Sequence, residues 1–348
     1  MTSAHPSLYS FEQFREIVSK VPRVELACTP TPLQEARVLS RRLAGPRIFL
    51  KRDDLTGVAF GGNKTRNLEF RLARTVSEHA DVVIVGLDLQ SNSARQTVGS
   101  CNKLGMKTVL VLEGEPPPQV QGNLLVDYLL GAEVHFARDR AAQRAKLDAL
   151  AEEVRRQGKV PHILNDNPMF DVASAIAYIE CTMEIVEQMR ALGTRPDFLF
   201  MSSSGKGQAG LVLARRLFGL ALDVHCVTAT REFDVAERTA EIANRTAQFL
   251  DLDVRIQPEE IENDDEYVGE GYGIPSEAGN AAVRLFAETE GVILDPVYTG
   301  KAAAGMLAQI QAGLCKPEQS VVFVHTGGTP ALFAYNEELT SGIAVRVL

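Results

Sequence analysis

Lys64 follows two glycines and an asparagine at the start of a helical pattern that covers residues 63–76. Glycines ahead of a helix let the backbone come close to a bound group, and the first helical turn offers free N–H donors and positive potential. A lysine held there beside a second cation, Arg66, can have its pKa lowered enough to attack an aldehyde as a free amine. A solvent-exposed lysine in the first turn is the simpler interpretation, and this motif alone leaves both open.

A second glycine-rich junction, Ser202 to Gly210, follows the strand-like run 197–202 and precedes another helical pattern. A strand, a Ser/Gly loop and a helix N-terminus together offer backbone amides and hydroxyls to an anion such as phosphate. The loop has neither the G-x-x-x-x-G-K-[ST] pattern of a nucleotide P-loop nor the G-x-G-x-x-G pattern of a dinucleotide site. A tight Ser/Gly turn without a ligand is the alternative.

Other loops place polar side chains where a ligand could meet them. Ser91 or Asn92 begins the helical pattern 92–104 and either caps that helix or binds a substrate carboxylate there. Tyr272 and Tyr298 each lie in a glycine-containing loop. Most buried tyrosines serve packing, but tyrosines in such loops are better placed to reach a ligand and transfer a proton.

The elements that must position these residues alternate between short strands and longer helices. Strand-like runs cover 47–51, 82–86, 107–112, 132–136, 197–202, 223–227 and 320–326. Helical patterns cover 63–76, 92–104, 120–130, 139–157, 171–190, 207–218, 231–248, 276–288 and 299–312. This alternation is typical of α/β proteins, in which helical crossovers connect parallel strands.

Composition excludes several classes of partner. The 348 residues carry 36 Lys and Arg against 45 Asp and Glu, a formal net charge of −9, which favours neither nucleic acid nor an anionic membrane. No run approaches the ~18 apolar residues of a membrane span. The chain starts without the pattern of a secretory signal, and its five cysteines never form a C-x-x-C pair, so we expect a cytoplasmic protein. The histidines are scattered and predict no metal site, and the acidic run 258–267 reads as a solvated surface loop.

The motifs together resemble one family of enzymes. The segments RDDLTG and GGNKTR (52–66), QSN (90–92), QAGL (208–211), GYGIP (271–275), DPVYTGKA (295–302) and HTGGTPALFAY (325–335) occur in the order typical of that family. It contains D-cysteine desulfhydrase and 1-aminocyclopropane-1-carboxylate (ACC) deaminase, which are pyridoxal-phosphate enzymes of fold type II, and the resemblance covers roughly residues 22–340. It implies two domains with open, twisted parallel sheets and helices on both faces, with 1–66 and 179–348 in the large domain and 67–178 in the small one.

The resemblance also implies roles for individual residues. Lys64 would form the Schiff base with pyridoxal 5'-phosphate, and Asn63 would contact the phenolic oxygen of the cofactor. Thr299 would face the pyridine nitrogen, and Tyr272 and Tyr298 match the active-site tyrosines. The cofactor phosphate would lie on Ser202, Ser203, Ser204, Gly205, Lys206, Gly207 and Gln208, and the substrate carboxylate on Ser91, Asn92 and Ser93.

Three departures from the family pattern stand out. Ser93 replaces a usual histidine, Lys206-Gly207 replaces a usual Gly-Thr, and Asn67 replaces a lysine that helps bind phosphate. We hypothesise that Lys206 supplies the charge that Asn67 lacks, from the opposite side of the phosphate.

The resemblance implies α,β-elimination on a small β-substituted amino acid such as D-cysteine, which gives pyruvate and ammonia. Thr299 stands where ACC deaminases typically have glutamate, which favours elimination over opening of a cyclopropane ring. The alternatives are an ACC-deaminase-like or β-replacement enzyme and a catalytically silent cofactor-binding protein. A homodimer is expected from the family.

Overall fold

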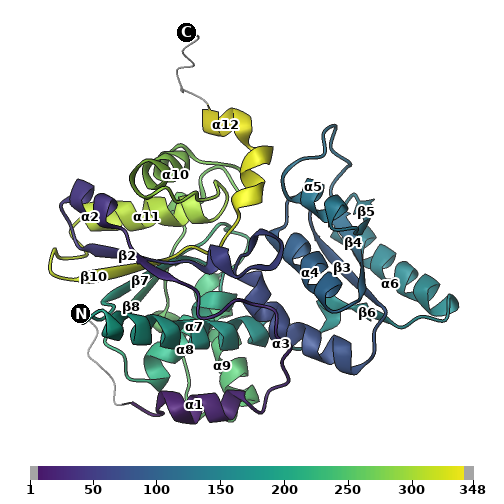
Figure 1. Ribbon diagram of the computed structural model, residues 1–348, viewed down its shortest axis with the longest axis horizontal. Coiled ribbons are helices and arrows are strands. Elements are labelled where there is room, and N and C mark those ends of the chain that lie inside the picture. The colour runs from purple at the N-terminus through teal and green to yellow at the C-terminus, as the bar shows by residue number, and fades with distance from the viewer. Residues whose placement is uncertain (1–6, 341–348) are drawn as a thin grey trace, which may run out of the picture.

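The computed structural model describes residues 7–340, and its strands form two separate sheets (Figure 1). The larger sheet has six strands and the smaller has four. All strands of the smaller sheet come from the interval 82–163, whereas those of the larger sheet come from both sides of it. The chain therefore leaves the large sheet, builds the small one and returns.

The six-stranded sheet has the order β1-β2-β10-β7-β8-β9. Its strands are β1 (Leu33–Glu35), β2 (Arg47–Lys51), β7 (Phe198–Ser202), β8 (Asp223–Val227), β9 (Glu262–Asp264) and β10 (Ser320–Val324). All neighbours are parallel except β1, which pairs antiparallel with β2 at one edge. The carboxyl ends of β7 and β10 therefore meet at one edge of the sheet, where ligands of open α/β sheets bind.

The four-stranded sheet has the order β5-β4-β3-β6 and is parallel throughout. Its strands are β3 (Val82–Asp88), β4 (Lys107–Glu113), β5 (Glu133–Ala137) and β6 (Pro161–Ile163). Register pairs Asp88 with Glu113, so two acidic residues lie side by side at the carboxyl edge of this sheet.

Helices cover both faces of each sheet. They are α1 (Phe11–Val18), α2 (Arg37–Leu43), α3 (Lys64–Ser77), α4 (Asn92–Lys103), α5 (Gly122–Leu129), α6 (Arg140–Arg156), α7 (Val172–Ala191), α8 (Lys206–Leu217), α9 (Val235–Phe249), α10 (Glu277–Glu290), α11 (Thr299–Gln311) and α12 (Asn336–Thr340). Figure 1 shows α2, α10 and α11 on one face of the large sheet and α1, α7, α8 and α9 on the other. The small sheet lies between α4 and α6. None of the helices in residues 7–340 is both long and apolar enough to cross a bilayer.

The predicted α/β class is confirmed, and each predicted strand and helix has a counterpart. The sequence missed short elements such as α2, β1 and β6, which bury too few side chains to give a clear period. It also missed α1, although Phe11, Phe14 and Val18 follow a helical period there and Ser10 with Gln13 forms a capping box. Short 3₁₀ turns also went unpredicted: Asp53–Leu55, Val58–Phe60, Leu164–Asp166, Pro258–Glu260, Glu266–Val268 and Thr329–Ala334.

The prediction of a solvated loop over 258–267 is wrong in part. Residues 262–264 form β9, which pairs with β8, and Asn263 donates its side-chain amide to Ser203 O at 3.0 Å. The strand is only three residues long and carries charged side chains at the sheet edge, features that discourage pairing with another chain and that also hide a strand in the sequence.

The predicted limits of the two domains, at 66/67 and 178/179, stay a prediction. Helix α7 spans the second limit and packs mainly against α8 on the large sheet. The chain ends at 1–6 and 341–348, which the prediction placed in the large domain, lie outside the described residues.

Candidate active site

Lys64 is the first residue of α3, and the loop before it requires glycine. Gly61 and Gly62 have φ angles of +68° and +127°. A Cβ on Gly61 would collide with the carbonyl oxygen of Asp54, and one on Gly62 would lie 2.5 Å from Nε2 of Gln96. The N–H of Asn63 donates to Thr326 O at 2.9 Å, so the loop after β10 fixes the start of α3.

The Lys64 amine is half-buried, and its pKa is lowered to about 8. Loss of hydration is the largest cause, followed by the positive charges of Lys206 and Arg71. The sequence suggested Arg66 as the neighbouring cation, and this is wrong. Arg66 is buried among carboxylates, with Nη2 2.8 Å from Asp53 Oδ1 and Nη1 2.7 Å from Glu184 Oε1, so its charge is neutralised.

The loop Ser202–Gln208 joins β7 to α8. The hydroxyl of Ser203 accepts the N–H groups of Gly205 at 3.2 Å and Gln208 at 3.1 Å. The side chain of Gln208 bonds outward to β9, since Nε2 donates to Glu262 O at 2.7 Å. The side chains of Ser203 and Gln208 thus hold the loop together. The N–H groups of Ser204, Lys206 and Gly207 have no acceptor among residues 7–340.

Two cations meet on Phe170 beside this loop. Lys206 Nζ lies 3.9 Å and Arg71 Cζ 3.8 Å from the centroid of the ring. Lys206 Nζ also pairs with Asp171 Oδ1 at 2.9 Å, whereas Nε of Arg71 is buried without a partner in the described chain. Burial lowers the pKa of Lys206 to about 8 and that of Arg71 to about 9. Both partly desolvated cations suit a doubly charged anion.

Sequence reasoning missed Arg71. It lies seven residues after Lys64 on α3, a spacing that puts both side chains on the same face of the helix. Asn67, between them on that face, is 4% exposed and its side-chain oxygen has no partner in residues 7–340. The i, i+3, i+7 spacing of Lys64, Asn67 and Arg71 was the available signal.

Ser91 caps α4 and Asn92 begins it. The Ser91 hydroxyl accepts the N–H groups of Ser93 at 3.2 Å and Ala94 at 3.3 Å. Oδ1 of Asn92 accepts the side-chain amide of Asn123 at 2.9 Å. The predicted cap is therefore present, and the three residues at this helix terminus, Ser91 to Ser93, are polar and uncharged.

Contacts between α3 and α4 bring this terminus to Lys64. The side-chain oxygen of Gln96 accepts the N–H of Thr65 at 2.9 Å. Arg95 is fully buried and donates to the carbonyl oxygens of Gly61, at 3.1 Å, and Ala59. Neither residue was marked in the sequence, because their role depends on a contact between distant segments.

Tyr272 and Tyr298 meet at their hydroxyls, which lie 2.5 Å apart. The hydroxyl of Tyr272 also donates to Asp88 Oδ2 at 3.1 Å, so a loop of the large sheet bonds to the end of β3 in the small sheet. Burial and then Asp88 raise the pKa of Tyr272, and burial and then Tyr272 raise the pKa of Tyr298. Both hydroxyls keep their protons at neutral pH.

Thr299 begins α11 and is fully buried. Its hydroxyl donates to Asp295 Oδ2 at 2.6 Å and accepts the N–H of Asp295 at 2.8 Å. A Cβ on Gly328 would lie 2.5 Å from that same carboxylate oxygen, and one on Gly327 would lie 2.8 Å from Cα of Gly62. Thr299 and Tyr298 therefore adjoin the loop that holds Lys64.

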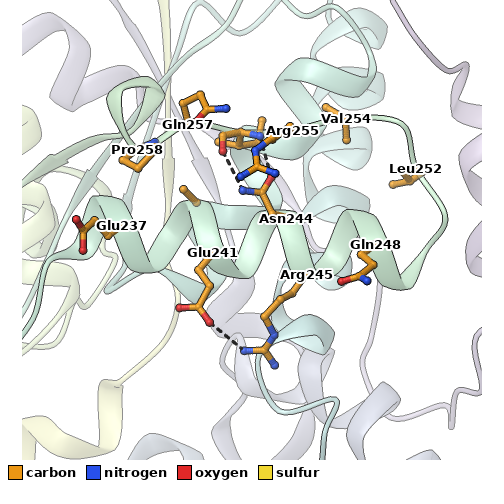
Figure 2. Close-up of a pocket in the computed structure, with 12 residues that line it drawn as sticks. Glu237, Glu241, Asn244, Arg245, Gln248, Leu252, Val254, Arg255, Gln257 and Pro258 are labelled. Atoms are coloured by element: carbon orange, nitrogen blue, oxygen red, sulfur yellow. Dashed lines mark hydrogen bonds and ion pairs between the residues drawn. The ribbon is translucent and has the colours of Figure 1, made fainter.

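An open groove on α9 contains none of these residues (Figure 2). It runs between α9 and the segment 252–258, and Arg245 on its wall pairs with Glu241 at 3.9 Å. Arg245 also lies 3.7 Å from Asp171 Oδ2, on the far side of the carboxylate that pairs with Lys206. The groove borders the site without contributing to it.

The sequence profile of the family described as pyridoxal-phosphate dependent enzyme matches residues 24–327. The chain belongs to this family. It is 37% identical over 328 residues to the D-cysteine desulfhydrase of Klebsiella pneumoniae subsp. pneumoniae, a match that covers 92% of this chain and 98% of that protein. It is 35% identical over 331 residues to the D-cysteine desulfhydrase of Salmonella typhi, with the same coverage.

Solved structures agree with this assignment. The crystal structure of an ACC deaminase homologue superimposes with a TM-score of 0.82 and 30% identity, and covers 97% of this chain and 99% of that chain. The predicted fold type II architecture and the predicted cofactor, pyridoxal 5'-phosphate, are both confirmed.

The residues of the site fit this cofactor. The free N–H groups of the Ser202–Gln208 loop and the unpartnered Nε of Arg71 match the acceptor oxygens of a phosphate. Lys64 offers an amine whose lowered pKa suits attack on an aldehyde. When bound, pyridoxal phosphate supplies an electron sink that stabilises negative charge at the α-carbon of an amino acid.

Proposed function

We propose that the protein is a pyridoxal-phosphate-dependent lyase that catalyses α,β-elimination on a small β-substituted amino acid, D-cysteine or a sulfonated or halogenated relative, to give pyruvate and ammonia. The observation that carries this proposal is the placement of Lys64, a half-buried amine with a lowered pKa, near both a cation-rich loop and an uncharged helix terminus. The names of the D-cysteine desulfhydrases similar to it support the reaction type.

Each end of the site has its own task in this proposal. The loop from Ser202 to Gln208, with Lys206, binds the phosphate, and Asn63 bonds to the phenolic oxygen of the cofactor. The N-terminus of α4, at Ser91 to Ser93, binds the carboxylate of the substrate, because free N–H groups and hydroxyls suit a single negative charge.

Lys64 would hold the cofactor covalently, and its Nζ takes the proton from the α-carbon of the substrate. A lysine with a pKa near neutrality exchanges protons in both directions at working pH. Tyr298 and Tyr272, whose hydroxyls stay protonated, assist by passing a proton to the departing group. The bond from Tyr272 to Asp88 joins the two sheets and favours closure over the substrate, which excludes water.

Thr299 is the proposed partner of the pyridine nitrogen. It brings no charge of its own, which suits elimination because the leaving group carries the electrons away. Ring opening of ACC is the second candidate, supported by the likeness to an ACC deaminase homologue.

One experiment separates these reactions. The purified protein, loaded with cofactor, is given D-cysteine, L-cysteine, L-cysteate and ACC, while pyruvate and 2-oxobutanoate are assayed. Pyruvate from a β-substituted amino acid supports elimination, and 2-oxobutanoate from ACC supports ring opening. Cofactor absorbance with no product from any of the four would contradict the proposal.

We also propose that the protein works as a homodimer in the cytoplasm. The homodimer follows from the family resemblance, and the cytoplasmic location from the cysteine pattern. Sedimentation of the purified protein, which gives its mass in solution, tests the first; a mass of one chain over the working concentration range would contradict it.

A further inference from the structure

Asp88 is a carboxylate of the site that the sequence did not mark. It ends β3, is half-buried, and accepts the Tyr272 hydroxyl on Oδ2 at 3.1 Å. Its backbone carbonyl accepts the N–H of Ser91 at 3.2 Å, so Asp88 and the start of α4 belong to one turn. Within residues 7–340, Oδ1 of Asp88 has no hydrogen-bond donor, and the carboxylate has no Lys, Arg or His at ion-pair distance.

Glu113 is a second carboxylate at the same edge of the small sheet, and its environment differs from that of Asp88. It ends β4 as the register partner of Asp88, and its Oε2 lies 3.5 Å from Nε of Arg140. The charge of Glu113 therefore has a counter-ion within the protein. Within residues 7–340, the charge of Asp88 is stabilised by one hydrogen bond, from the Tyr272 hydroxyl, and otherwise only by solvent. A half-buried carboxylate is poorly stabilised in this way.

The cluster of Asp88, Tyr272 and Tyr298 is open to a ligand. Tyr272 is 42% exposed, and Asp88 and Tyr298 are each half-buried, so all three residues reach solvent. An unpaired carboxylate in such a place attracts a cation and repels an anion. Because the α4 terminus takes the substrate carboxylate in the proposed function, and the cofactor takes the α-amine, the cation must come from the side chain of the substrate.

We infer that Asp88 is a specificity residue that selects small amino acids with an ammonium group on the side chain and disfavours those with an anionic side chain. This inference rests on the proposed function and narrows it, since it favours an amine at Cβ as the leaving group and argues against a sulfonate.

The reaction of such a substrate balances without an oxidant. The Cα–H bond breaks, with its proton passing to Lys64, the Cβ–N bond breaks, and a Cα–Cβ double bond forms. The β-nitrogen leaves as ammonia with both electrons of the C–N bond. Hydrolysis of the released enamine consumes one water and gives pyruvate and a second ammonia.

The test compares the holoenzyme with its Asp88→Asn variant, which keeps the shape of the side chain and removes the charge. The probes are both enantiomers of 2,3-diaminopropionate (β-ammonium), β-chloroalanine (neutral) and cysteate (anionic), with kcat/KM measured from pyruvate release. We expect Asp88→Asn to lower the ratio of diaminopropionate to β-chloroalanine by about 10- to 100-fold, the range for a hydrogen bond to a charged group, and to raise the ratio for cysteate.

Glu113→Gln is the matched control, because it removes a carboxylate from the neighbouring strand whose charge already has a counter-ion. It should leave both ratios within about 2-fold. An equal loss for all three substrates in Asp88→Asn would overturn the inference, since it would mean that Asp88 only orients Tyr272. A wild-type preference for cysteate over diaminopropionate would overturn it without any variant.

Binding separates this inference from the proposed function. Dissociation constants of diaminopropionate and cysteate are read from the change in cofactor absorbance, whether or not turnover follows. A charge-dependent shift in these constants with no pyruvate from any substrate would refute elimination and keep the role of Asp88. Turnover of β-chloroalanine with unchanged ratios in Asp88→Asn would refute the role of Asp88 and keep elimination.

Discussion

The N-termini of α4 and α8 are built alike and differ in charge. Each begins after a parallel strand, and each has a serine hydroxyl that accepts two backbone N–H groups, Ser91 in α4 and Ser203 in α8. Lys206 and Arg71 lie beside α8 on the ring of Phe170. The cation nearest the start of α4, Arg95, is instead used inside the protein.

The use of Arg95 explains the difference. Its guanidinium donates to the backbone carbonyls of Ala59 and Gly61 and to Asn123 Oδ1 at 2.8 Å, and burial lowers its pKa to about 10. Its Nη2 donates to Asn92 Oδ1 at 3.4 Å, so all three nitrogens of the guanidinium bond within the protein.

A helix terminus whose nearest arginine is bonded within the protein suits one carboxylate. A terminus beside Arg71, whose Nε has no partner in residues 7–340, and beside Lys206, which pairs with Asp171, suits a phosphate, so nearby side chains decide which anion an otherwise similar junction binds.

Lys64 adjoins both termini, and its replacement should have the largest effect. Lys64→Ala should abolish the visible absorbance of the covalently bound cofactor and lower kcat by about 1,000-fold or more, because the nucleophile and the base are one amine. Lys64→Arg keeps the charge and should fail equally. Retention of the absorbance band in either variant would remove Lys64 from this role.

Replacing both cations beside the N-terminus of α8 should leave this terminus without the charge that distinguishes it from the N-terminus of α4. The double variant Arg71→Met, Lys206→Met should bind pyridoxal phosphate about 100-fold or more weakly, since two charge-assisted contacts are lost. Pyridoxal, which lacks the phosphate, should bind the variant and the wild type alike at a pH well above the pKa of Lys64, where the amine is free in both proteins. Equilibrium dialysis of the apoprotein measures both ligands.

Arg245→Met is the control for this experiment. Arg245 lines the groove of Figure 2 and pairs with Asp171 Oδ2, whereas Lys206 pairs with Oδ1 of the same carboxylate. The substitution therefore removes a nearby cation that does not adjoin the Ser202–Gln208 loop. It should change the affinity for the cofactor by less than about 3-fold. An equal loss in Arg245→Met and in the double variant would mean that only the general positive field matters.

A substitution at the N-terminus of α4 should weaken binding of the substrate and leave binding of the cofactor unchanged. Ser91→Ala should raise KM about 5- to 10-fold, leave cofactor affinity unchanged, and lower the free energy of unfolding by about 1 kcal/mol through loss of the cap. Asp139→Ala is the control, because Asp139 caps α6 of the same sheet, with Oδ1 2.7 Å from the N–H of Ala142. It should lower stability by a similar amount with KM unchanged, as steady-state kinetics and urea unfolding would measure.

The smallest expected effect is on the titration of Lys64. Its pKa is lowered, so the amine is protonated below about pH 8 and free above it. The rate at which the apoprotein captures pyridoxal should therefore rise with pH and reach half its maximum near pH 8. Arg71→Met removes one of the cations that lower this pKa and should move the midpoint to higher pH. A midpoint that moves to lower pH would contradict the electrostatic argument.

Local features of this site were readable from the sequence. The junctions at Ser91 and Ser202 each combine serine with a change from strand to helix periodicity, and two glycines precede the helix that starts at Lys64. The structure has helices at all three places and strands before the first two. Such signals depend on residues within a few positions of one another.

The pairings that the sequence missed depend on contacts between distant segments. Arg71 and Lys206 act together only because Phe170 lies between α3 and α8, and Asp88 meets Tyr272 only because the loop of one sheet reaches the edge of the other. The wrong choice of Arg66 as the cation beside Lys64 has the same origin, because its partners Asp53 and Glu184 come from elsewhere in the chain.

The backbones of Gly327 and Gly62 lie against each other, and this contact fixes the position of Lys64. A library that randomises either position should return glycine alone among active clones, even though neither residue has a side chain to take part in chemistry. A single methyl group at residue 327 would lie 2.8 Å from Cα of Gly62 and push the start of α3 away from β10, so one added atom there is enough to move Lys64 out of position.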